Sequence, residues 1–223
     1  MKFVVIISCV IFLLSSCLKP TNQLPEFHYE YFPVQIGSWI EYEVVDITHT
    51  SLGSDTLNYF LKEIKSIEFI DNEGEVSQRI ERYWKFDITD EYVVKDIWYS
   101  KITTTTAESV EENNRYTKLI FPVKHGAYWD GNAYNSFNEW EYEYDSIHEP
   151  YMINGLSFDS TLKVIQRDSI HTAVEYENCH EIYAKHVGMV FKKHIDLNIN
   201  LYNILDINEG NELELKLIDF GND

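Results

Sequence analysis

Hydrophobic and polar residues alternate with a period of two in several parts of the chain. The clearest case is residues 140–145, where Trp and Tyr occupy one parity and Glu and Asp the other. The same alternation occurs in residues 40–44, 80–87 and 212–217. This period is typical of β-strands with one buried face, so the pattern predicts a mainly β protein.

Turn-forming residues separate these segments, and Gly, Asn and Asp favour tight hairpins because they tolerate positive φ. The predicted turns are Gly53-Ser54, Asp71-Asn72-Glu73-Gly74, Gly131-Asn132, Asn154-Gly155 and Asn208-Glu209-Gly210-Asn211. Residues 57–68 fit helical and strand spacing about equally, and we favour a strand because a turn signal follows. The expected fold is an antiparallel β-sandwich or a partly open β-barrel of roughly ten strands with few helices.

Two segments of the chain echo each other. Residues 32–39 read FPVQIGSW, and residues 121–129 read FPVKHGAYW. Proline is excluded from central ladder positions and glycine permits a tight turn, so each copy is suited to lead the chain into a strand that begins with Trp. Two related halves and two independent loops both account for the echo.

The N-terminus has the pattern of a bacterial export signal. Lys2 precedes an apolar run over residues 3–14, which is too short to span the ~30 Å hydrocarbon core of a membrane as a permanent helix. Leu14-Ser15-Ser16-Cys17 follows, and it resembles the lipobox of bacterial lipoproteins. The resemblance implies cleavage before Cys17 and acylation of that cysteine, with palmitate among the acyl chains. An ordinary secretory signal is the alternative.

This reading divides the chain into three parts: a signal peptide (1–16), a lipidated N-terminus and tether (17–26) and a single β-rich domain (27–223). In the lipoprotein pattern, a residue other than Asp after the cysteine implies the outer membrane, and here it is Leu18. The expected location is therefore the cell envelope, with the lipid as the contact to the membrane. The sequence leaves open whether the domain faces the periplasm or the cell surface.

The domain is strongly acidic. The chain has 18 Lys and Arg against 37 Asp and Glu, for a net charge of −19, and cleavage would also remove Lys2. A field of this sign repels phosphate backbones, so no nucleic-acid partner is expected. It suits a solvated acidic surface or a cationic partner.

The cysteines and histidines are candidates for a nucleophile or a zinc site. Of Cys9, Cys17 and Cys179, only Cys179 would remain with a free thiol, as a small buried hydrophobe or as a nucleophile beside His180. Cys179, His180, His186 and His194 lie too far apart along extended strands for a zinc site unless a turn folds them together. We expect no metal and no cofactor.

Other candidate sites have simpler explanations. Residues 71–75 (DNEGE) offer oxygen ligands for calcium, but a hairpin turn explains them better. His148-Glu149 and His180-Glu181 lack the second histidine of a zinc-protease helix, and no nucleophile-elbow or phosphate-loop motif is present. We therefore expect no enzyme activity. Trp98, Trp129 and Trp140 are candidates for stacking on sugars, although tryptophans of β domains are more often core residues.

A family resemblance covers both ends of the domain. Residues 31–42, with Tyr31-Phe32-Pro33, Gly37 and Trp39, and residues 181–190 (EIYAKHVGMV) resemble uncharacterised bacterial envelope lipoproteins. The resemblance implies fold and location and carries no catalytic residue. The hypothesis is a membrane-anchored lipoprotein with a non-enzymatic binding or structural β domain, which contacts an envelope protein or a glycan. The alternatives are an envelope hydrolase, a glycan-binding accessory lipoprotein and a structural subunit of an outer-membrane assembly.

Overall fold

The computed structural model describes residues 26–222 and consists almost entirely of β-strands. The predicted signal peptide (1–16), Cys17 and all of the tether except Glu26 lie outside the described residues. The elements are a 3-10 turn η1 (Tyr29–Tyr31) and strands β1 (Ser38–Thr50), β2 (Gly53–Ile70), β3 (Val76–Lys85), β4 (Val93–Ile102), β5 (Thr106–Glu111), β6 (Asn114–Ile120), β7 (Tyr128–Asp130), β8 (Glu141–Ile153), β9 (Leu156–His171), β10 (Glu175–Ala184), β11 (Gly188–Asn200) and β12 (Asn203–Asn222).

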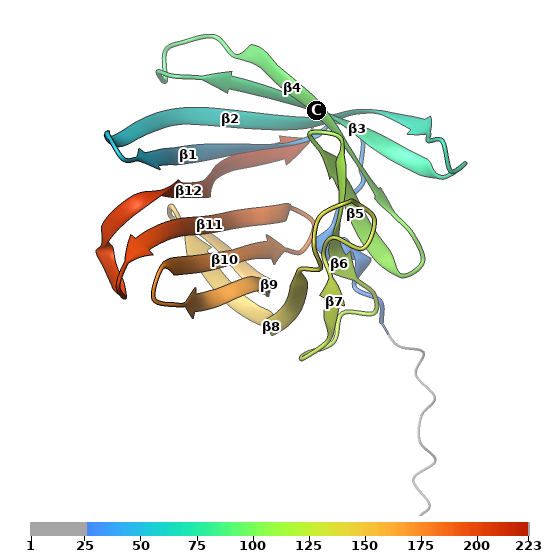
Figure 1. The fold of residues 1–223 in the computed structure, drawn as a ribbon. Coiled ribbons are helices and arrows are strands. Elements are labelled where there is room, and N and C mark those ends of the chain that lie inside the picture. Colours follow the sequence, from blue (N-terminus) through green and yellow to red (C-terminus); the bar gives the residue numbers. More distant parts are fainter. Residues whose placement is uncertain (1–25, 223) are drawn as a thin grey trace, which may run out of the picture.

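All twelve strands belong to one antiparallel sheet with the order β6-β5-β4-β3-β2-β1-β12-β11-β10-β9-β8-β7. Every sequential pair except β6 and β7 is a hydrogen-bonded neighbour, and β1 pairs with both β2 and β12. The sheet curls so that β1 to β4 face β9 to β11 (Figure 1). The prediction of an antiparallel, partly open barrel is therefore confirmed, with twelve strands in place of roughly ten.

Alternation explains how the strands build the core. On β1, the side chains of Ile40, Tyr42 and Val44 are buried, and Tyr42 lies opposite Leu61 of β2 and Leu217 of β12. These apolar side chains form a row across three strands, and burying each one contributes about 1.5–3 kcal/mol to folding.

A second core cluster lies under the N-terminal segment and the edge strands. Tyr31, Leu119, Tyr144 and Leu162 have no exposed side-chain surface and come from η1, β6, β8 and β9. No helix within residues 26–222 has the length and apolar character to cross a membrane.

Main-chain and side-chain hydrogen bonds join the edge strand β6 to the segment after β7 and to β8, where the barrel would otherwise be open. The Thr117 amide of β6 donates to the Gly131 carbonyl, which follows β7 (N···O 2.9 Å). The buried Tyr144 hydroxyl accepts from the Ile120 amide (2.9 Å) and donates to the Ile120 carbonyl (2.8 Å). A few individual hydrogen bonds therefore hold the barrel together at the β6–β7 seam. β6 and β7 are not paired by a continuous ladder of main-chain hydrogen bonds.

The echoed segments occupy matching places in this architecture. Residues 32–37 lead into β1, the first of six strands, and residues 121–126 lead into β7, the first of the other six. Gly37 and Gly126 both adopt positive φ, at 85° and 69°. The echo thus coincides with the division of the barrel into two halves of six strands.

Two predicted turns are misplaced. Gly53-Ser54 begins β2, and the chain reverses just before it, at residues 51–52. Residues 208–211 lie inside β12, and the chain reverses instead at Leu201 and Tyr202, which have φ of 44° and 66°. Gly210 is required for a different reason, because a Cβ there would lie 2.3 Å from the Asp196 carbonyl oxygen of β11. The glycine at this position therefore indicates a close approach of β12 to β11, and it does not mark a turn.

We expect Tyr144→Phe to weaken the seam. The change leaves the Ile120 amide and carbonyl without their partner, which should lower the free energy of unfolding by about 1–3 kcal/mol. Urea denaturation measures the loss, and amide hydrogen exchange at Ile120 should accelerate. Tyr128→Phe, at a side chain that is 70% exposed in β7, is the matched control and should change stability by less than about 0.5 kcal/mol. Equal losses in both variants would contradict this account of the seam.

Candidate functional site

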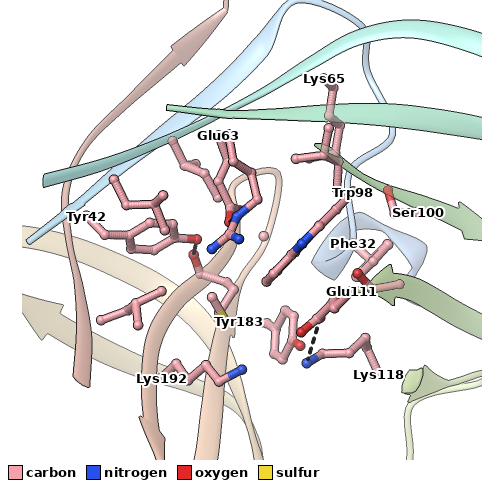
Figure 2. A pocket seen from close by; sticks show the side chains of 18 of the residues that line it. Phe32, Tyr42, Glu63, Lys65, Trp98, Ser100, Glu111, Lys118, Tyr183 and Lys192 are labelled. Atoms are coloured by element: carbon pink, nitrogen blue, oxygen red, sulfur yellow. Dashed lines mark hydrogen bonds and ion pairs between the residues drawn. The ribbon is translucent and has the colours of Figure 1, made fainter. Parts of the chain in front are cut away.

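The barrel encloses a cavity of about 110 Å³ between its two walls. Figure 2 shows Tyr42, Glu63 and Trp98 reaching in from one side and Tyr183, Lys118 and Lys192 from the other. Part of the lining is apolar and part is charged. The apolar part includes Phe32, Ile40, Leu61, Met189, Leu213 and Leu215, and the charged part consists of Glu63, Lys65, Arg82, Glu111, Lys118 and Lys192.

Arg82 of β3 is held from three sides and is 5% exposed. Its Nε donates to Glu63 (2.8 Å), and its Nη1 donates to both carboxylate oxygens of Asp96 (2.9 and 3.0 Å). The guanidinium also lies 3.4 Å from the centre of the Trp98 ring. A guanidinium with two acids and an aromatic face has little freedom to move, so this corner of the cavity is rigid.

Glu181 of β10 is fully buried and joins the opposite wall to β6. It accepts from Lys118 (2.6 Å) and lies 3.4 Å from the Lys192 ammonium. The Tyr183 hydroxyl donates to its other oxygen (2.6 Å), and Glu111 lies 3.5 Å from Lys118. Two lysines and a hydroxyl therefore converge on one carboxylate in the barrel interior.

These charges perturb one another's titration. Burial by itself would raise the pKa of Glu181, but the ammonium groups of Lys118 and Lys192 outweigh it and lower the pKa to about 2. Burial would lower the pKa of Lys118, yet Glu111 and Glu181 raise it above its usual value. Glu181 and Lys118 therefore both stay ionised across the physiological pH range.

Two polar groups that line the cavity stand outside this network. Among residues 26–222, the Lys65 ammonium of β2 has no carboxylate within 4.0 Å, and burial lowers the pKa of Lys65 despite the nearby charge of Glu63. Ser100 of β4 is 2% exposed, and its hydroxyl has no hydrogen-bond partner in the described part of the chain. Buried polar groups are nearly always paired, so the Ser100 hydroxyl calls for an explanation. Lys65 is partly exposed, and its ammonium is a cation of the lining without an adjacent carboxylate.

The structure separates the residues weighed as a zinc site. The Cys179 thiol lies 3.2 Å from His194 Nδ1, but His180 packs beside Phe191 and His186 is exposed in the turn before β11. Among the side chains that the structure describes, in residues 26–168 and 172–222, no three from His, Cys, Asp and Glu are grouped to hold a metal ion. Cys179 is 1% exposed, and burial raises the pKa of its thiol to about 12, which argues against a nucleophilic role.

Residues 71–75 form the turn between β2 and β3. One Asp71 oxygen accepts from the amides of Glu73 and Glu75 (2.9 and 3.0 Å), and the other accepts from the Lys101 ammonium (2.9 Å). The Lys101 ammonium is thus the positive charge beside this carboxylate. The hairpin interpretation of these residues is the one that the structure supports.

The three tryptophans are each partly covered or buried. Arg82 covers Trp98, and Arg167 lies 4.7 Å from the centre of the Trp140 ring. Trp129 is 9% exposed in the second core cluster, and its indole donates to the Thr117 carbonyl at the seam. Trp98 alone of the three lines the cavity.

His148 belongs to a cluster that the sequence did not reveal. Its Nδ1 lies 2.8 Å from the Tyr31 hydroxyl, which also lies 2.8 Å from the Ser160 hydroxyl. Glu30 of the same segment pairs with Lys185 (2.9 Å). These contacts fix η1 onto β8 and β9. They join residues more than a hundred positions apart, so no local pattern signals them.

The cavity charges were also missed, although one signal for them was present. Arg82 has the same parity as Ile80 and Trp84, so a charged residue stands on the apolar face of its strand. An inward-pointing charge on a strand needs a partner across the interior. The identity of that partner depends on the curl of the sheet, which alternation does not encode.

No protein-family model and no curated protein sequence matches this chain. Two solved structures are similar to it, a proposed exported protein of Bacteroides fragilis with a YmcC-like fold and a proposed lipoprotein of Parabacteroides distasonis. Each is 12% identical, covers 84% of this chain and 98% of its own, and gives a TM-score of 0.43 or 0.44, respectively. Likeness at this level identifies neither a family nor a function.

We expect Glu181→Gln to lower the free energy of unfolding by about 3–5 kcal/mol, because Lys118 and Lys192 then remain buried without their counter-charge. Glu214→Gln, which breaks a partly exposed pair with Lys216, is the control and should cost less than about 1 kcal/mol. Chemical denaturation of both variants measures the difference. A loss at Glu181 no larger than at Glu214 would refute the role of this network.

The lowered pKa of Glu181 also predicts how the stability of the protein depends on pH. Because the folded pKa of Glu181 is lowered to about 2, its contribution is complete above the unfolded pKa of about 4.3 and is lost as the pH falls toward 2. Between pH 5 and 2, wild-type stability should therefore fall more steeply than that of Glu181→Gln. Parallel curves would show that Glu181 is not the carboxylate responsible.

Proposed function

We propose that this protein is a lipid-anchored lipoprotein of the bacterial cell envelope whose β-barrel is a non-enzymatic binding module. The ligand in this proposal is a small amphipathic molecule held in the barrel cavity. The observation that carries the proposal is the cavity itself, which combines an apolar wall, charged side chains and one buried hydroxyl, that of Ser100, which has no partner in the described part of the chain. Concave, mostly apolar sites with a few convergent polar groups are the usual form of small-molecule sites.

The chemistry of the cavity favours binding over hydrolysis. A general acid needs a raised pKa near the working pH, whereas the pKa of Glu181 is lowered to about 2. Glu63 is engaged by Arg82, and Glu111 lies 3.5 Å from Lys118. Carboxylates fixed in ion pairs orient and position neighbouring groups, and they are poorly suited to transfer protons.

The anchor in this proposal rests on the sequence. Residues 1–16 have the form of a cleaved signal, Cys17 closes a lipobox, and Leu18 favours the outer membrane. Two or three acyl chains hold a protein durably at a membrane, because each buried CH₂ contributes about 0.8 kcal/mol. The described domain begins only nine residues after Cys17, so the barrel would stand close to the lipid surface.

Cys17→Ala should release the domain from the membrane without unfolding it, because the lipid lies outside the core. Cells grown with a labelled fatty acid, followed by membrane fractionation and intact mass, make the measurement. Wild-type protein should carry label and sediment with membranes, and the variant should do neither. Unlabelled, soluble wild-type protein would overturn the anchor.

Filling the cavity should abolish binding of a small apolar probe. We expect wild-type protein to bind benzyl alcohol in saturation-transfer NMR and Met189→Trp to lose this binding, because the larger side chain occupies the cavity. Met152→Trp, at a side chain that is 70% exposed beyond the cavity, is the matched control and should bind as wild type does. Thermal unfolding confirms that both variants fold. Unchanged binding in Met189→Trp would place the probe elsewhere.

A further inference from the structure

We infer that the cavity is built for a small carboxylate, whose anionic group binds at Lys65 and Ser100 and whose apolar body lies against the opposite part of the lining. This inference rests on the proposed binding function and specifies its ligand class. Three observations carry it: the charges of the lining, the two polar groups without partners, and the size and character of the remaining space.

The lining is cationic although the protein is anionic. Four basic side chains and two acidic ones line the cavity, whereas the whole chain has a net charge of −19. Asp96 and Glu181 lie behind the lining and neutralise Arg82 and Lys118. Together with Glu63 and Glu111, these acids make four carboxylates beside Arg82, Lys118 and Lys192, so the positive charge left to attract an anion is that of Lys65.

Lys65 is the cation of the cavity lining that forms no ion pair with a described carboxylate. Arg82, Lys118 and Lys192 each have a carboxylate within 3.4 Å, whereas the Lys65 ammonium has none within 4.0 Å in residues 26–222. Glu63, two residues earlier on the same face of β2, is already engaged by Arg82. Lys65 is partly withdrawn from water, and a ligand carboxylate would supply the counter-ion that its ammonium lacks.

Ser100 supplies a neutral donor on the same wall. In the sheet register, Lys65 of β2 pairs with Ile80 of β3, and Ile80 pairs with Trp98 of β4. Ser100 follows Trp98 by two residues and therefore shares its face. A hydroxyl that is 2% exposed and has no partner among the described residues can donate to a carboxylate oxygen that Lys65 has drawn in. An ammonium and a hydroxyl together satisfy one carboxylate.

The remaining space suits a single ring. An engineered cavity of about 150 Å³ in another protein binds benzene, and the cavity here is about 110 Å³ with an opening to solvent. Aromatic side chains line it, including Phe32, Tyr42, Tyr59 and Tyr183. Aromatic pairs favour offset or edge-to-face contacts, so a small aromatic acid fits better than a long acyl chain.

The test compares three probes of one shape and different charge: benzoate, benzyl alcohol and benzylammonium. NMR titration of the domain at neutral pH should give the tightest binding for benzoate, at least about tenfold tighter than benzyl alcohol, and the weakest for benzylammonium. Lys65→Met should remove the preference for benzoate and leave the affinity for benzyl alcohol within about twofold. Lys62→Met, the neighbouring lysine that does not line the cavity, should preserve the preference.

The outcomes separate this inference from the proposed function. Equal binding of benzoate and benzyl alcohol, or tightest binding of benzylammonium, would overturn the carboxylate inference and leave the cavity as a binding site. Absence of binding by all three would overturn both. A structural role for Lys65 would make Lys65→Met less stable, whereas an unpaired ammonium predicts equal or higher thermal stability. If Lys65→Met does not fold, Ser100→Ala tests the same inference. It should weaken the binding of benzoate and leave the binding of benzyl alcohol unchanged.

Discussion

The buried carboxylate of Glu181 links parts of the barrel that the sheet itself leaves separate. Lys118 belongs to β6, an edge strand of one half, whereas Glu181 and Lys192 belong to adjacent strands of the other half. Their ion pairs cross the interior and complement the few bonds of the β6–β7 seam. Because an ion that loses its partner inside a protein is strongly destabilising, this network constrains how the two halves can close.

Ion pairs in the interior also explain why the barrel has a cavity. Twelve strands enclose more space than a single layer of apolar side chains fills, and charged groups keep some of that space polar. Well-packed apolar residues in place of buried ion pairs are often as stable or more stable. Stability alone therefore does not account for the charged lining. Fully paired groups such as Arg82 hold the wall rigid, and the unpaired ones face the space.

Local patterns account for most of the strands. The alternation in residues 40–44 and 140–145 identified buried and exposed faces correctly, because a strand turns each successive side chain to the opposite side. The ambiguous segment 57–68 lies within β2. The turn at Leu201 and Tyr202 was not predicted, because neither residue type favours positive φ. Gly210 suggested a turn, but a glycine is needed there because β11 passes too close for a side chain.

The sequence by itself determined the strands, the antiparallel fold class and the inward-facing charge of Arg82, since each depends on periodicities within a few residues. It also carries the whole case for an anchor at Cys17, which lies outside the described residues. Only the tertiary structure decided that Lys118 meets Glu181, 63 residues away, and that Lys65 and Ser100 share an enclosed space. The reason is physical: which inward-facing side chains meet depends on how the sheet curls, and no local pattern specifies that curvature.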